Sequence, residues 1–115
     1  MTFASHDAYI ASVAPEVRPL LLSIQETVEA LLPKAARCIS YNMPAFRDER
    51  VFFYFAAFRK HIGIFPPVHR HASLIVELAP FRGPKGNLSF PLNRPLPLDL
   101  IGRVAVALHV ERERG

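Results

Sequence analysis

Hydrophobic residues recur at helical spacing near the start of the chain. Their separations of three and four residues place them on one face of a helix. This stripe consists of Val17, Leu20, Leu21, Ile24, Val28 and Leu31. Pro15 suits the first position of the helix, and Pro33 ends it. Ser5, with Asp7 two residues later, favours a short capped helix before it, which Ala14 and Pro15 interrupt.

A second helical stripe lies near the end of the chain. Pro97 can open this helix, and Asp99 in its first turn suits the positive end of the helix dipole. The stripe consists of Leu100, Ile101, Val104 and Leu108. Residues 69–78 form a further short segment that can be helical.

Between these helices the pattern changes to short runs rich in aromatic and β-branched residues, which are typical of strands. The expected strands cover residues 37–41, 51–58, 61–65 and 87–90. Pro44 predicts a bend or bulge at 42–44, because proline cannot donate a hydrogen bond to a strand ladder. Residues 48–50 are expected to turn, and 59–60 form a short hairpin loop.

A two-residue loop at 59–60 fixes the register of its hairpin. Ala57 then pairs with Ile62, Phe55 with Ile64, and Ala56 with Gly63. Side chains alternate across a strand. One face therefore carries Val51, Phe53, Phe55, Ala57, Ile62 and Ile64, and we expect helices to cover it. The other face carries Phe52, Tyr54, Ala56, Phe58, His61, Gly63 and Phe65, and the small Ala56–Gly63 pair predicts a dent walled by aromatic rings.

Two helices, a run of strands and a final helix, with no βαβ pattern, predict an α+β fold. We expect one domain over residues 1–115, a sandwich in which the N-terminal and C-terminal helices pack on the same face of one antiparallel sheet. A chain of 115 residues, half of them hydrophobic and 21% charged, is not expected to be disordered. It is long enough for one core.

Composition also limits the classes of function. Cys38 is the only cysteine, which excludes an internal disulfide. The start of the chain shows no secretory signal and no segment has the length of a membrane span, so a cytoplasmic protein that does not enter a membrane is expected. The net charge of +4 is spread over scattered arginines, which does not favour nucleic-acid binding.

Three stretches of the sequence resemble the YdhG/YdeI-like family of domains of unknown function. They are ISYNMPAF at 39–46, YFAAFRKHIGIF at 54–65 and PKGNLSFPLNRPLPLDLI at 84–101; YIASVAPEVRPLL at 9–21 also fits the family's opening. The family positions matched are Tyr41, Met43, Pro44, Phe46, His61, Lys85 and Phe90. The resemblance implies a compact domain of helices packed on a sheet. One bacterial branch of the family is described as frataxin-like iron chaperones, which deliver iron for iron–sulfur cluster and haem assembly.

The residues themselves show no constellation for catalysis, neither paired carboxylates nor a nucleophile beside a base. We therefore expect a non-enzymatic binding domain, and the resemblance implies an iron-chaperone-like accessory protein. Carboxylate oxygens suit loosely held iron. The candidate ligands are Glu26 and Glu29, three residues apart on the long helix, and Asp48 and Glu49 in the following turn.

The alternative is a module that binds a small apolar ligand, a peptide or a protein partner on the aromatic sheet face; a second copy of the chain, forming a homodimer, could also cover it. His61 would orient a ligand there, and Tyr41 or Lys85 could reach the rim. The candidate ligand-binding residues are Tyr41, Met43, Phe46, Tyr54, Phe58, His61, Gly63, Lys85 and Phe90.

Overall fold

Five strands form one antiparallel sheet in the order β1-β2-β3-β4-β5, so that each strand pairs with its neighbour in the sequence. The computed structural model describes residues 2–83 and 86–114. The elements are α1 (His6–Ser12), α2 (Arg18–Leu31), β1 (Ala36–Ser40), β2 (Met43–Arg47), β3 (Val51–Ala57), β4 (His61–Phe65), α3 (Ala72–Leu78), the 3₁₀ turn η1 (Ala79–Phe81), β5 (Leu88–Pro91) and α4 (Leu98–Arg114).

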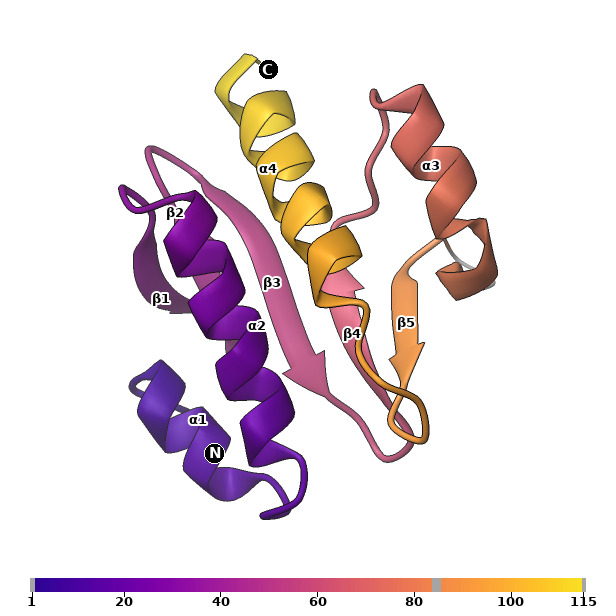
Figure 1. The fold of residues 1–115 in the computed structure, drawn as a ribbon. Helices are drawn as coiled ribbons and strands as arrows, with labels where there is room; N and C mark the ends of the chain where they lie inside the picture. The colour runs from indigo at the N-terminus through magenta and orange to yellow at the C-terminus, as the bar shows by residue number, and fades with distance from the viewer. Residues whose placement is uncertain (1, 84–85, 115) are drawn as a thin grey trace.

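The helices form a second layer on one face of this sheet. Figure 1 shows α2 and α4 side by side in front of the strands, with α1 beside the lower part of α2 and α3 near β5. The expected α+β arrangement is therefore confirmed. Among the described residues, no helix is both long and apolar enough to span a membrane.

The core lies between these two layers. It includes the aromatic side chains Phe46, Phe53 and Phe55 from the sheet, each with no exposed surface. From the helices, Ile24 of α2 and Val104 of α4 are equally buried. The apolar stripes predicted from helical spacing thus face the sheet, although Leu31 at the end of α2 remains half exposed.

A glycine lets α2 and α4 approach each other closely. A Cβ atom added at Gly102 would lie 2.7 Å from Cδ1 of Leu31 and 3.1 Å from Cγ2 of Thr27. These distances are shorter than ordinary van der Waals contact. The absence of a side chain at Gly102 therefore sets the spacing of the two helices that cover the middle of the sheet.

Two local predictions need correction. Helix α2 begins at Arg18, three residues after Pro15, because residues 15–17 form a turn and Pro19 occupies the first turn of the helix instead. Pro44 lies inside β2. Proline has no backbone N–H to donate to a neighbouring strand. Pro44 pairs with Ile39 of β1, and because the pairing of β2 with β3 begins only at Ala45, no hydrogen bond to β3 is lost at Pro44.

The hairpin between β1 and β2 turns through two residues in the left-handed region. Tyr41 and Asn42 have φ angles of 52° and 58°, and Ser40 pairs with Met43 on either side of them. Positive φ at both central residues is the pattern of the type I′ hairpin turn. Asparagine adopts this conformation readily, whereas a tyrosine does so at some cost. The turn leaves Tyr41 84% exposed.

Candidate functional site

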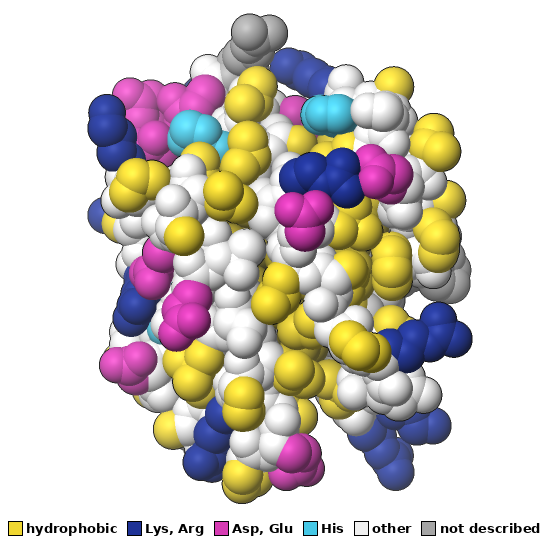
Figure 2. Space-filling model, viewed as in Figure 1, with side chains coloured by type: hydrophobic (Ala, Val, Ile, Leu, Met, Phe, Trp, Pro, Cys, Tyr) yellow, Lys and Arg dark blue, Asp and Glu magenta, His cyan; other side chains and the backbone are white. Residues whose placement is uncertain are grey.

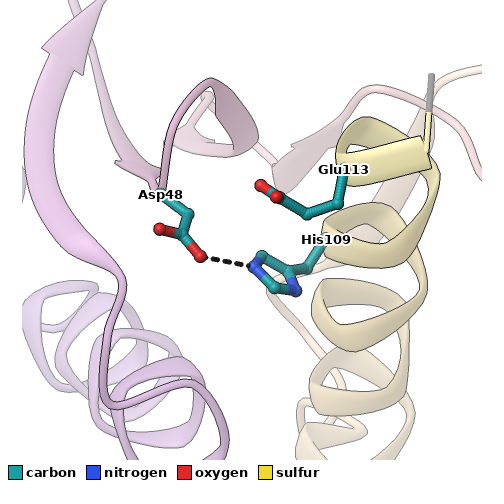
Figure 3. Close-up of side chains that lie close together, drawn as sticks. All are labelled: Asp48, His109 and Glu113. Carbon is teal, nitrogen blue, oxygen red and sulfur yellow. Dashed lines mark hydrogen bonds and ion pairs between the residues drawn. The ribbon is translucent and has the colours of Figure 1, made fainter.

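Three ionisable side chains meet at the end of the molecule where α4 finishes. Asp48 lies in the turn that follows β2, whereas His109 and Glu113 lie one helical turn apart on α4. One ligand atom from each of the three lies within 4.8 Å of the others. Figure 3 shows the Asp48 carboxylate beside the His109 imidazole, with the Glu113 side chain of α4 reaching toward both.

The imidazole of His109 is held from two directions. Its Nε2 donates a hydrogen bond to Oδ2 of Asp48 at 2.9 Å. Its ring also packs edge-on against Phe52, with the centroids 5.0 Å apart. The side chains of His109 and Asp48 are 24% and 35% exposed, so an ion in solution can reach them. The three side chains therefore form a partly ordered, accessible cluster.

This cluster has the donor chemistry of a metal site. An imidazole nitrogen and two carboxylates suit divalent first-row metals, and the two carboxylates balance the charge of such an ion. Ligand atoms around an ion with bonds of ~2.1 Å lie roughly 3 Å apart at right angles. The Asp48–His109 separation of 2.9 Å already matches that spacing. Rotation of the Glu113 side chain would bring its carboxylate to a similar distance from the other two ligand atoms, which already lie within 4.8 Å of it.

The aromatic face of the sheet has the register expected from the sequence. Tyr54 pairs with Phe65, Ala56 with Gly63, and Phe58 donates its backbone N–H to His61 across the 59–60 loop. The placement of Phe52 on that face was wrong. A bulge pairs Arg47 with Val51 and Phe46 with Phe53, and the additional residue, Phe52, packs against His109 of α4.

The expected dent beside Gly63 is filled. A Cβ atom at Gly63 would lie 2.9 Å from Cε2 of Phe58 and 3.0 Å from Cζ of Phe65. The ring of Phe58 stacks on His61 at 4.9 Å and meets Phe65 edge-on at 6.5 Å. The aromatic side chains have thus collapsed into the space that the missing side chain leaves, instead of standing around it.

Comparison with solved structures identifies a similar fold. A protein of the DUF1801 family, YdhG from Bacillus subtilis, superposes with a TM-score of 0.78 at 20% sequence identity, over 93% of this chain and 90% of that one. The fold is that of a DUF1801 protein. A scan against protein-family models found no match, and a search of curated proteins found none. The resemblance that the motifs indicated is confirmed at the level of the fold.

The motif residues of the DUF1801 resemblance divide between the two faces of the sheet. Phe46 and Phe90 are buried, Phe46 against α1 through His6 and Phe90 against Phe81 of η1, so they are core residues and not open to a ligand. The residues on the opposite face are all at least partly exposed. They are Tyr41, Met43, Tyr54, Phe58 and His61. Lys85 lies outside the described residues.

The four carboxylates expected to bind iron do not come together. Glu29 receives two hydrogen bonds from Arg37, at 2.6 and 3.0 Å. This pairing lowers the pKa of Glu29 and occupies both of its oxygens. Glu26 is exposed elsewhere on α2, and Glu49 lies outside the cluster that contains Asp48. Of the four carboxylates, only Asp48 lies beside other potential metal ligands in the part of the chain that the structure describes.

His109 and Glu113 were not among the residues that the sequence predicted to bind a metal. Near the end of a helix, a histidine such as His109 suits the negative end of the helix dipole, and Glu113 was not singled out. The available signal was their spacing of four residues on one helix, which puts two potential ligands on the same face. Their partner, Asp48, is 61 residues before His109, and no local pattern connects the two.

The filled face gives a testable expectation for Gly63. Replacing Gly63 by leucine should displace the rings of Phe58 and Phe65 and lower the free energy of unfolding by about 1–3 kcal/mol. Urea unfolding measures this loss. Because Phe58 is 45% exposed, the combined G63L/F58A protein should lose less than the sum of the two single changes. Additive losses would show that the ring does not occupy this space.

Proposed function

We propose that this protein is a non-enzymatic binding domain that takes up a divalent metal ion at Asp48, His109 and Glu113. The single observation that carries the proposal is the convergence of one imidazole and two carboxylates, from two separate elements, within 4.8 Å. Ferrous iron is the ion we infer as cargo, because the mixed nitrogen and oxygen donors suit it and the fold resembles the family with an iron-chaperone branch.

The exposed position of the cluster favours reversible binding of an ion over permanent binding. Two of the three side chains come from one surface helix and the third from a turn, and none is deeply buried. Figure 2 shows acidic side chains gathered beside a histidine at this end of the molecule. Three protein ligands leave coordination positions that water can fill and that ligands of an acceptor can take over. Weak, exchangeable binding follows from this arrangement.

Anaerobic titration calorimetry with Fe²⁺ tests the proposal, with Mn²⁺ and Zn²⁺ as comparison ions. We expect one ion per chain. Asp48→Asn or Glu113→Gln should each weaken binding by about tenfold or more, because losing a ligand costs at least as much as losing an outer-shell partner. Circular dichroism of each variant checks that the fold is retained.

Two other carboxylates of the same surface type provide matched controls. Glu26→Gln and Glu49→Gln remove equal charge from exposed positions that lie outside the cluster, so binding should change by less than about twofold. Binding that survives the doubly substituted D48N/E113Q protein would place the ion elsewhere. Absence of binding for all three ions would refute the proposal.

A further inference from the structure

A groove of about 1200 Å³ runs along the helical layer, between α3 on one side and the outer faces of α2 and α4 on the other. Leu31, Val106 and Val110 line it and are 51%, 37% and 46% exposed. Figure 2 shows hydrophobic side chains in the hollow between the helices. Helix α4 therefore carries exposed apolar residues, Val106 and Val110, besides the stripe that it buries against the sheet.

Polar contacts connect the two walls of the groove. Arg103 of α4 donates two hydrogen bonds of 2.8 Å to the two carboxylate oxygens of Glu77 on α3. Glu111 of α4 accepts from the backbone N–H groups of His69 and Arg70, both at 3.0 Å, just before α3. These bonds tie α3 to α4 at two places without filling the space between them. The groove is thus formed before any ligand arrives.

Two arginines and two carboxylates line the groove, and of the two arginines only Arg103 is in an ion pair among the described residues, with Glu77 and Asp99. Each acidic side chain that lines it has a partner, since Glu111 bonds the two backbone N–H groups and Asp99 lies 3.6 Å from Arg103. Within the described chain, the guanidinium of Arg70 has no carboxylate within 4.0 Å. His71 accepts from the N–H of Leu74 through Nδ1, which leaves its Nε2 as a donor.

We propose that this groove binds an amphipathic carboxylate with an aliphatic chain, such as a medium-chain fatty acid. The chain would lie on Leu31, Val106 and Val110, and the carboxylate would meet Arg70 and the Nε2 of His71. The volume of about 1200 Å³ is somewhat above the roughly 300–1,000 Å³ of small-molecule sites, which are mostly apolar with a few placed polar groups. Arg70, which has no carboxylate partner in the described part of the chain, is the group that would attract the negatively charged head group.

Calorimetry of metal-free protein with decanoate and dodecanoate, below their micelle concentrations and at low ionic strength, tests the inference. The two added methylenes should strengthen binding, by about fourfold for each one that is buried. Arg70→Gln should weaken dodecanoate binding by about two- to fivefold and leave the binding of dodecanol unchanged. Chelator in the buffer keeps this result independent of the proposed metal site.

Two exposed valines give a matched pair of variants. Val106→Glu should weaken dodecanoate binding by about tenfold or more, because it removes apolar contact and adds a like charge. Val76 is 74% exposed on α3 and does not line the groove, so Val76→Glu should leave binding unchanged. The inference is wrong if dodecanoate does not bind, if Val106→Glu binds it as well as Val76→Glu does, or if dodecanol binds as tightly as dodecanoate to the unmodified protein.

Discussion

Replacing Val104 by aspartate is expected to lower the free energy of unfolding by about 3–5 kcal/mol. Val104 has no exposed surface and belongs to the core between α4 and the sheet. A carboxylate at this position would leave water without gaining a partner, and it would also remove apolar contacts. Because the whole stability of a small domain is about 5–15 kcal/mol, a large share of it would be lost.

Urea unfolding followed by circular dichroism measures this effect against two other positions. Val76→Asp makes the same chemical change at a site that is 74% exposed, and it should change stability by less than about 0.5 kcal/mol. Leu20 is only partly buried on α2, so Leu20→Asp should fall between the two. Equal losses at Val104 and Val76 would contradict the placement of α4 on the sheet.

Replacing His6 by alanine is expected to cost about 2–4 kcal/mol. His6 is 2% exposed and connects four elements. Its Nε2 lies 3.1 Å from the carbonyl oxygen of Cys38 and 2.9 Å from that of Ala45, and its Nδ1 accepts from the side-chain amide of Gln25 at 3.0 Å. Alanine would leave these buried groups without partners and open a cavity beside Phe46, whose ring centroid lies 5.2 Å from that of His6.

The same histidine makes stability depend on pH. Burial lowers the pKa of His6, and its bonds to the two carbonyl groups oppose that shift only in part. The unfolded chain, with an ordinary histidine pKa of about 6.5, therefore takes up a proton at a higher pH than the folded protein. Stability that is present above pH ~6.5 should be lost as the pH falls toward the lowered pKa of the folded state.

Urea unfolding at intervals between pH 8 and pH 5 checks this expectation. His6→Gln should remove part of the slope in this range, whereas His69→Gln, at an exposed position, should leave it unchanged. The lowered pKa of Glu29 acts below this window, because an ordinary glutamate titrates near pH 4.5. A slope that stays the same without His6 would show that the imidazole is not buried in its neutral form.

The sequence by itself determined the two layers and much of the sheet. Helical spacing and the prolines around the long helices indicated which faces of α2 and α4 pack inward, and Ser5 caps α1 as its position suggested, accepting from Ala8 at 3.1 Å. The two-residue loop at 59–60 was enough to set the pairing of β3 with β4. These features depend on residues close together in the chain, so local periodicity and turn geometry specify them.

Tertiary structure alone decided the candidate sites. A bulge opposite Arg47 turned Phe52 toward His109, and that contact helps to position the imidazole beside Asp48. The rings of Phe58 and Phe65 filled the space over Gly63 because close packing is favoured over an open apolar dent. The groove beside α4 lies where one ion pair, between Arg103 and Glu77, and the hydrogen bonds of Glu111 connect α4 to α3 and to the residues before it. Each of these outcomes depends on distances between elements that are remote in sequence, and only the packed fold sets those distances.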